Sequence, residues 1–231
     1  MQPDPRGLGS PMDEVLTALG LSLGVAALAT VGIALPAVWV GTALARGRGW
    51  WRAPLETVCM APLVLPPVVT GYALLVLLGP LGPLATLWHA VGGSPAFTTA
   101  ACVLASAVVS FPLFVRSVRQ AVEAVDPGLE EAAATLGASR FRIWREVTWP
   151  LSRGGLVAGA VLAFARSLGE FGATIVVAGN IEGQTRTLPL ALYRWLQVPG
   201  GESRALVLAG VSVLLAVGTV AISEWLSRRS A

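Results

Sequence analysis

The sequence predicts an all-α integral membrane protein with about five transmembrane helices, and three observations support this fold class. Only 13% of the 231 residues are charged and 55% are hydrophobic, whereas soluble domains carry about 25% charged residues. The mean hydropathy is +0.71. The apolar residues gather in runs of the roughly 20 residues that a helix needs to cross the hydrocarbon core, and the arginines gather between these runs.

Five apolar segments are long enough to span the membrane. In chain order they cover residues 15–45, 55–79, 96–116, 154–178 and 203–226. Two other apolar stretches, 81–92 and 187–198, are too short to cross and are predicted to be interfacial or re-entrant. Together these segments predict one transmembrane domain.

The two ends of the chain are predicted to lie outside this transmembrane domain of residues 15–226. Residues 1–14 are acidic and interrupted by prolines, so they are interpreted as a disordered leader on the outer side, not as a signal peptide. The sequence leaves open whether Met1 or Met12 starts the chain. Residues 227–231 are interpreted as a cytoplasmic tail.

The arginines predict the orientation, because basic residues concentrate in cytoplasmic loops. They cluster after the first span, between the third and fourth spans, and at the C-terminus. These arginines are Arg46, Arg48, Arg52, Arg116, Arg119, Arg140, Arg142, Arg145, Arg153, Arg228 and Arg229. Five spans put all three clusters on one side, with the N-terminus outside and the C-terminus in the cytoplasm; six spans would break this agreement. The pattern is one of membrane topology and disfavours nucleic acid as a partner.

All 16 basic residues are arginine, and the absence of lysine excludes two kinds of chemistry. A Walker A loop needs a lysine to reach the phosphates of ATP, and Schiff-base catalysis needs a lysine amine. One histidine, His89, and two cysteines without CxxC spacing, Cys59 and Cys102, are too few for a metal-ligand cluster. The chain is therefore predicted to have no catalytic residues and no cofactor or metal site, and not to be an enzyme.

Residues 126–150, called here the charged loop, separate the third span from the fourth. Asp126 followed by Pro127 predicts a helix start, because an aspartate caps the first N–H groups and proline fits the first turn. Gly137 is predicted to end this helix in a left-handed conformation. Ser139 is predicted to cap a second helix, which Pro150 stops, with Phe141, Trp144 and Thr148 on one face.

The spacing in the charged loop resembles the EAA signature of ABC importer permeases. Glu131-Ala132-Ala133 is followed by three residues and Gly137, then by twelve residues and Pro150. Trp144, Val147 and Trp149 stand where that family usually has an aromatic, an isoleucine and a leucine. In the family this loop forms coupling helices that sit in a groove of a cytoplasmic ATPase subunit. The residues that the resemblance assigns to ATPase coupling are Glu130, Glu131, Ala132, Ala133, Gly137, Ala138, Phe141, Trp144 and Pro150. Read without the resemblance, the loop is a solvated amphipathic linker.

The fourth predicted span contains two charged residues, Arg166 and Glu170, one helical turn apart. At 1.5 Å per residue from Gly154, Arg166 is about 18 Å into a hydrocarbon core that is roughly 30 Å thick. Ionised groups at that depth need a partner or a watery path. Two interpretations have equal support: an ion pair that holds the helices together, and a gate that lines a pathway.

The second span carries Pro62, Pro66 and Pro67, which remove backbone donors and predict a bend. The residues alone fit a simple kink or a broken helix that lines a pathway. Thr70 and Gly71 lie just beyond the bend.

The wording "ARSLGEFGATIVVAGN", "GQTRTLPLALY" and "APLVLPPVVTGYALLVLLG" resembles the molybdate branch of these permeases, over most of residues 15–226. The resemblance implies a type I ABC importer permease in a bacterial inner membrane. It favours the pathway interpretation, for which the candidate residues are Pro66, Pro67, Thr70, Gly71, Arg166, Glu170 and Thr174. The outer segment with Asn180, Thr185, Arg186 and Thr187 is expected to be an outer gate, a docking surface or an ordinary polar loop.

The resemblance implies a homodimer that imports an oxyanion, molybdate first, by alternating access. The implied partners are an ATPase dimer that binds ATP and Mg²⁺, a periplasmic or lipid-anchored oxyanion-binding protein, and membrane lipid. The alternatives are tungstate or sulfate/thiosulfate transport, and a membrane scaffold or sensor that uses the charged loop to bind another partner. The sequence identifies neither the oxyanion nor the conformational state.

Overall fold

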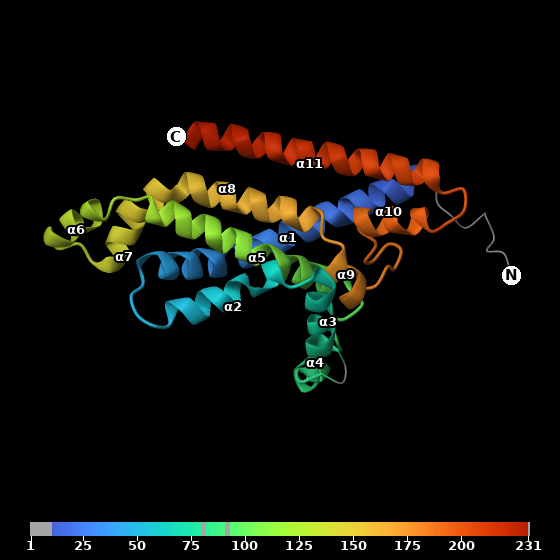
Figure 1. Cartoon of the computed structure of the whole chain (residues 1–231), viewed down its shortest axis with the longest axis horizontal. Helices are drawn as coiled ribbons and strands as arrows, with labels where there is room; N and C mark the ends of the chain where they lie inside the picture. The colour runs from blue at the N-terminus through green and yellow to red at the C-terminus, as the bar shows by residue number, and fades with distance from the viewer. Residues whose placement is uncertain (1–10, 80–81, 91–92, 231) are drawn as a thin grey trace.

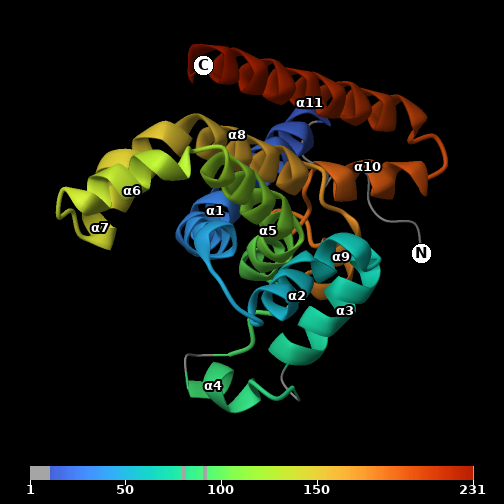
Figure 2. The same cartoon turned by 60° about the vertical axis from the view of Figure 1, so that its left-hand side comes forward.

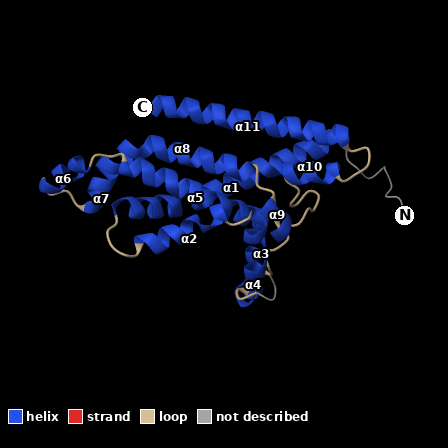
Figure 3. Cartoon of the chain, viewed as in Figure 1, coloured by secondary structure: helices blue, strands red, loops and turns tan. Residues whose placement is uncertain are grey.

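The computed structural model describes residues 11–79, 82–90 and 93–230, and within these residues every regular element is a helix (Figure 3). Four helices or helical runs are long and apolar enough to cross a membrane: α1 (Pro11–Arg46), α5 (Thr99–Glu123), α8 (Trp149–Leu168) with the residues before it, and α11 (Glu202–Ser230). A bent pair, α2 (Arg52–Val64) and α3 (Pro67–Leu78), makes a fifth span if the two are taken together. The predicted fold class, with about five spans, is confirmed.

The remaining elements are short helices between the long ones (Figure 1). They are α4 (Ala85–Ala90), α6 (Pro127–Thr135), α7 (Arg140–Ile143), the π-helix η1 (Trp144–Thr148), α9 (Gly172–Val177) and α10 (Leu188–Leu196). Helices α3 and α4 project away from the layer of long helices (Figure 2).

Helices α1, α5 and α8 form the core. Leu44, Val115 and Val118 are fully buried between them. Small residues let α5 and α8 approach closely: a Cβ added at Gly155 would lie 2.4 Å from the Cβ of Ala121, and one at Gly159 would lie 2.7 Å from the Cβ of Ser117. The glycines of α8 therefore permit close packing against α5.

The arginine-rich segments lie at one end of the molecule. The α1–α2 loop, α6 with α7, and the C-terminal end of α11 are all at the left of Figure 1. This arrangement agrees with an odd number of crossings, as the five-span prediction requires.

The chain ends differ from the predicted domain limits. Residues 1–10 of the expected leader lie outside the described residues. Residues 11–14, assigned to the same leader, are the first turn of α1, because Glu14 is held by Arg186 and Arg194 of later segments. At the other end, residues 227–230 of the expected tail continue α11.

Two predicted spans are not continuous helices. The second is broken after Val64, with α2 and α3 at 111° to each other, so the expected bend is a complete break. The fourth was predicted as one helix over 154–178, but α8 ends at Leu168 and α9 starts at Gly172. Glu170 therefore lies in a break between two helices, not one turn along a helix from Arg166.

Candidate functional site

The charged loop begins as the sequence predicts. Asp126 caps α6 and its Oδ1 accepts a hydrogen bond from the N–H of Gly128 at 2.8 Å. At the other end Gly137 has a φ of +85°. The N–H of Ala138 donates to the carbonyl of Ala133, and the N–H of Gly137 to that of Ala134, which is the hydrogen-bond pattern of a Schellman ending. Gly137 thus turns the chain by the left-handed conformation that glycine permits.

The second half of the charged loop contradicts the role predicted for Pro150. Ser139 caps α7, accepting from the N–H of Arg142, but the helix then runs through η1 into α8 without a stop. Pro150 lies in the first turn of α8. The five residues of η1 form a wider π turn, in which the N–H of Trp149 donates to the carbonyl of Trp144. This wider turn shifts the hydrogen-bond register before Pro150, which has no N–H to donate.

The π turn also changes which side chains share a face. Trp144 contacts Phe141, with ring centroids 6.2 Å apart, and Trp149, five residues on, at 5.4 Å. Thr148 was predicted on the same face as Phe141, but it is buried while Phe141 is exposed. An extra residue in a helical turn rotates everything that follows it, so the 3.6-residue period fails here.

Glu130 points into the protein and joins three segments. Its Oε1 lies 3.1 Å from Nη2 of Arg46, at the end of α1, and accepts a hydrogen bond from the hydroxyl of Thr148 at 2.7 Å. Nη2 of Arg46 also donates to the carbonyl of Val125 at 2.8 Å. We call Arg46, Glu130 and Thr148 the loop anchor. It fixes α6 and η1 to the end of α1.

The next residue, Glu131, is exposed and makes no ion pair with the described residues. Leu136 and Phe141 are also exposed. The other residues assigned to coupling range from half-buried to exposed: Ala132, Gly137 and Pro150 are exposed, while Ala133, Ala138 and Trp144 are half-buried. The two adjacent glutamates therefore have different positions. Glu130 stabilises the loop, and Glu131 is on the surface that a partner can contact.

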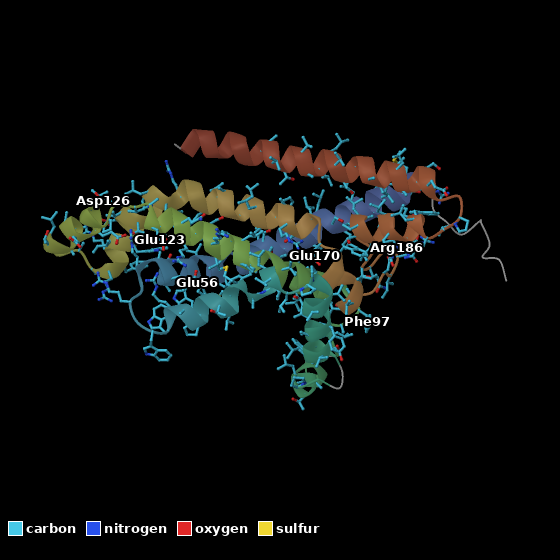
Figure 4. The ribbon with its side chains drawn as sticks, viewed as in Figure 1. Glu56, Phe97, Glu123, Asp126, Glu170 and Arg186 are labelled. Atoms are coloured by element: carbon cyan, nitrogen blue, oxygen red, sulfur yellow. The ribbon has the colours of Figure 1, made fainter. Side chains whose placement is uncertain are left out.

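The second candidate site lies where the two broken spans meet. Leu65 and Pro66 have extended backbones between α2 and α3. Each of them precedes a proline, which disfavours helical backbone, and the two prolines that follow have no N–H to donate to a helix. Pro67 is the first residue of α3. We call residues 65–71 and 166–174 the double break. Figure 4 shows its Glu170 between Asp126 at the charged-loop end and Arg186 at the opposite end.

Glu170 has two partners inside the double break. Its Oε2 lies 2.9 Å from Nη1 of Arg166, and its Oε1 accepts a hydrogen bond from the N–H of Ala173 at 2.7 Å. The Glu170 side chain is only 2% exposed, and the Arg166 side chain is 29% exposed. The predicted ion pair is confirmed. The Glu170 carboxylate also caps the start of α9 by accepting from the N–H of Ala173. In a continuous helix that N–H would already be bonded to a backbone carbonyl.

Helices α3 and α9 are in backbone contact across the double break. A Cβ at Gly71 would lie 2.6 Å from the carbonyl oxygen of Ala173, and one at Gly172 would lie 2.8 Å from the Cβ of Pro67. Thr174 is buried and donates to the carbonyl of Phe171 at 3.1 Å. Thr70 is buried too, and its hydroxyl has no partner among the described residues. Of the residues assigned to the pathway, Pro67 and Gly71 thus contact the start of α9, and Glu170 and Arg166 pair with each other beside it.

We expect Gly71→Ala to lower the stability of the protein by about 1–3 kcal/mol, because the added methyl meets a backbone carbonyl that cannot move alone. Thermal unfolding of the detergent-purified protein measures this. Gly210→Ala in α11 is the matched control, since a Cβ there meets nothing within 4 Å. An equal melting temperature for the two variants would contradict the close approach of α3 and α9.

The outer segment is not a docking surface formed by the four side chains that the sequence singled out. Thr185, Arg186 and Thr187 are buried. Nη1 of Arg186 lies 2.8 Å from Oε2 of Glu182 and 3.3 Å from Oε1 of Glu14, and Nε donates to Oδ1 of Asn180. These contacts tie the segment to the start of α1, so the side chains of Arg186 and Asn180 bind groups within the protein.

Sequence reasoning missed the partners that make these sites. Arg46 was read only as a topology signal, and Thr148 only as a helix-face residue. Arg119 of α5 forms ion pairs with Glu56 of α2 and with Glu123, another link at the arginine-rich end. Among the described residues no group of three His, Cys, Asp or Glu side chains could hold a metal ion.

Comparison with known proteins gives consistent results. The family described as binding-protein-dependent transport system inner membrane component matches residues 37–231. The molybdenum transport system permease protein ModB of Escherichia coli K12 is 49% identical over 94% of this chain and 96% of its own length. ModB of Haemophilus influenzae is 45% identical, over 93% of this chain and 94% of its own.

Solved structures show the same fold. An inward-facing structure of the MetNI methionine ABC transporter superposes with a TM-score of 0.71 at 18% identity, covering 97% of this chain and 100% of that one. A bacterial alginate ABC transporter, solved with a pentasaccharide-bound periplasmic protein, gives 0.71 at 17% identity, covering 93% and 78%. With its apolar spans, its charged loop and these matches, the chain belongs to the family of binding-protein-dependent transport system inner membrane components.

Proposed function

We propose that this chain is the membrane-spanning permease subunit of an ATP-driven molybdate importer. The substrate is proposed from the relatives that are named as molybdenum transport permeases and that match 93–94% of this chain at 45–49% identity. The double break supports transport, because broken helices with buried polar groups at mid-depth are a common feature of membrane transporters.

The coupling of transport to ATP rests on one observation, the position of the charged loop. The loop anchor holds it rigidly against α1, while Glu131, Leu136 and Phe141 remain exposed at the arginine-rich end. A separate ATPase subunit could therefore bind the exposed residues of the charged loop and move the helices to which the loop anchor fixes it. The ATPase would bind the ATP and Mg²⁺ itself and contact these exposed residues from the cytoplasm.

The proposed mechanism is alternating access. When the ATPase dimer closes, it draws the charged loops of two permease copies together. Each loop is continuous with α8 through η1, so its movement reaches Arg166 and the double break directly. The pathway then opens toward the outer side, receives the oxyanion from a periplasmic or lipid-anchored binding protein, and resets after hydrolysis.

The second permease copy is proposed to cover α2 and α3. These helices expose apolar side chains, among them Val58, Val64 and Tyr72, beside the double break. The proposed orientation puts the arginine-rich end in the cytoplasm, with the N-terminus outside and the C-terminus inside.

ATP-dependent uptake into vesicles that contain the reconstituted transporter tests the substrate. We expect radiolabelled molybdate to accumulate, tungstate to compete, and sulfate to compete weakly. Uptake of sulfate alone, with no accumulation of molybdate, would refute the proposed substrate.

The exposed glutamate tests the coupling. Glu131→Lys should abolish co-purification of the ATPase and reduce uptake at least tenfold, because it reverses an exposed charge on the loop without breaking any ion pair among the described residues. Glu202→Lys, the same change at the start of α11 on the opposite end, should leave both unchanged. Normal ATPase binding by the Glu131 variant would contradict a coupling role for this loop.

A further inference from the structure

A cleft of about 820 Å³ lies between the end of α1, the start of α2 and the charged loop. Four arginines line it, Arg46, Arg48, Arg52 and Arg140, together with Glu130 and Glu131. Arg46 and Glu130 neutralise each other in the loop anchor. The side chains of Arg48, Arg52 and Arg140 make no hydrogen bond or ion pair with any residue that the structure describes. Only the charge of Glu131 offsets theirs, so the cleft is positive.

A second, apolar groove of about 700 Å³ adjoins this cleft. Arg140, Trp144 and Thr42 line both spaces, so the two lie next to each other. Trp39, Leu35 and Trp51 form much of the groove wall.

The groove follows the outward face of α1. Leu35 and Trp39 are 83% and 73% exposed, on the side of α1 away from its packing against α5 and α8. From Leu35 to Arg46 is eleven residues, or about 16 Å of helix. Half of a hydrocarbon core of roughly 30 Å is about 15 Å, so the groove and cleft together match one leaflet of the membrane in depth.

We propose that the cleft and groove form a binding site for one anionic phospholipid. The phosphate of the headgroup lies among Arg48, Arg52 and Arg140, and an acyl chain lies along Leu35 and Trp39. Basic pockets at the membrane surface select anionic headgroups by charge, and arginine matches phosphate oxygens by its planar fork of N–H donors. A bound lipid would brace the loop anchor, because Arg140 belongs to the charged loop and Arg48 to the α1–α2 loop that follows Arg46.

The groove decides between a lipid and other anionic ligands. A free phosphate or transported oxyanion uses the cleft but has nothing to place along Leu35 and Trp39. An acidic segment of a cytoplasmic partner reaches the arginines but does not enter the bilayer depth that the groove spans. Of these ligands, only a phospholipid places an anionic group in the cleft and an apolar chain in the groove. This inference needs only a membrane-embedded chain, so it stands or falls separately from the proposed substrate.

Native mass spectrometry of the full-length protein, titrated with phosphatidylglycerol and with phosphatidylcholine, tests the site. We expect phosphatidylglycerol to bind at least tenfold more tightly. In the triple variant Arg48→Gln, Arg52→Gln, Arg140→Gln, the affinity for phosphatidylglycerol should fall by about fivefold for each arginine removed. The variant should therefore no longer prefer phosphatidylglycerol to phosphatidylcholine. The matched control is Arg116→Gln, Arg145→Gln, Arg153→Gln, which removes the same charge from three exposed arginines outside the cleft.

Two further measurements keep the test decisive. Trp39→Ala should weaken phosphatidylglycerol binding several-fold while the melting temperature stays unchanged, because Trp39 is on the outer face of α1. Millimolar inorganic phosphate should not displace the lipid. Equal loss of preference in both triple variants, no preference in the parent protein, displacement by phosphate, or displacement by the co-purified ATPase would each overturn the proposal.

Discussion

Arg166→Ala is expected to destabilise the permease by about 3 kcal/mol, because it leaves the buried carboxylate of Glu170 without its counter-ion. The value is at the low end for broken buried pairs, since the N–H of Ala173 still donates to Glu170 and the Arg166 side chain is partly exposed. Adding Glu170→Gln should recover most of the loss, because glutamine is uncharged and still accepts the hydrogen bond from Ala173. Thermal unfolding of the three proteins in detergent measures the effect.

Uptake by the same variants separates the two interpretations of the pair. If Arg166 and Glu170 serve only to hold the double break together, the double variant regains both stability and transport. If they line the pathway, stability returns while uptake stays low. A double variant as unstable as Arg166→Ala would show that the two side chains are not paired in the membrane.

Glu130→Ala is expected to cost about 2 kcal/mol, because it leaves the buried hydroxyl of Thr148 unpaired and removes the counter-ion of Arg46. Glu130→Gln should cost less, since its carbonyl oxygen still accepts from both partners. Glu131→Ala should leave the melting temperature unchanged, because Glu131 is exposed and has no ion pair among the described residues. Unfolding curves of the three variants provide the comparison.

Transport by these variants should follow a different order from stability. Glu131→Ala should reduce ATPase association in a protein that is fully folded, whereas Glu130→Ala should weaken coupling through a loosened loop. A double-mutant cycle with Arg46→Ala measures the pair itself, and we expect an interaction of about 1 kcal/mol for this half-buried pair. Identical behaviour of Glu130→Ala and Glu131→Ala in both assays would contradict the division of roles between them.

Local signals in the sequence predicted much of this protein. The apolar runs located the spans, Asp126 and Ser139 located the two helix starts in the charged loop, and Gly137 located the turn between them. Each signal acts through groups within a few residues: a cap carboxylate binds an N–H two or three residues on, and glycine relieves a clash within its own backbone. Such features need no knowledge of the remaining chain.

Other predictions failed because the local pattern is compatible with more than one backbone structure. Pro150 was expected to stop a helix, but a proline in a first turn is tolerated and η1 adjusts the register before it. Glu170 was expected on a helix, but α8 stops at Leu168 and α9 restarts against α3, where Gly71 and Gly172 permit backbone contact. The ion pair between Arg166 and Glu170 was predicted correctly, but the helical backbone predicted at Glu170 was wrong. Two residues four positions apart can form an ion pair with or without a continuous helix.

Hydropathy, charge bias and helix caps are properties of neighbouring residues, so they located the apolar spans, the arginine-rich end and the two helix starts of the charged loop, but not the breaks within two of the spans. Which of the two adjacent glutamates anchors the loop and which is exposed depends instead on contacts between distant segments. Glu130 meets Arg46 from 84 residues away, and Glu14 meets Arg186 from 172. Such pairs exist only after packing brings distant helices together, and no periodicity or spacing along the chain encodes that distance.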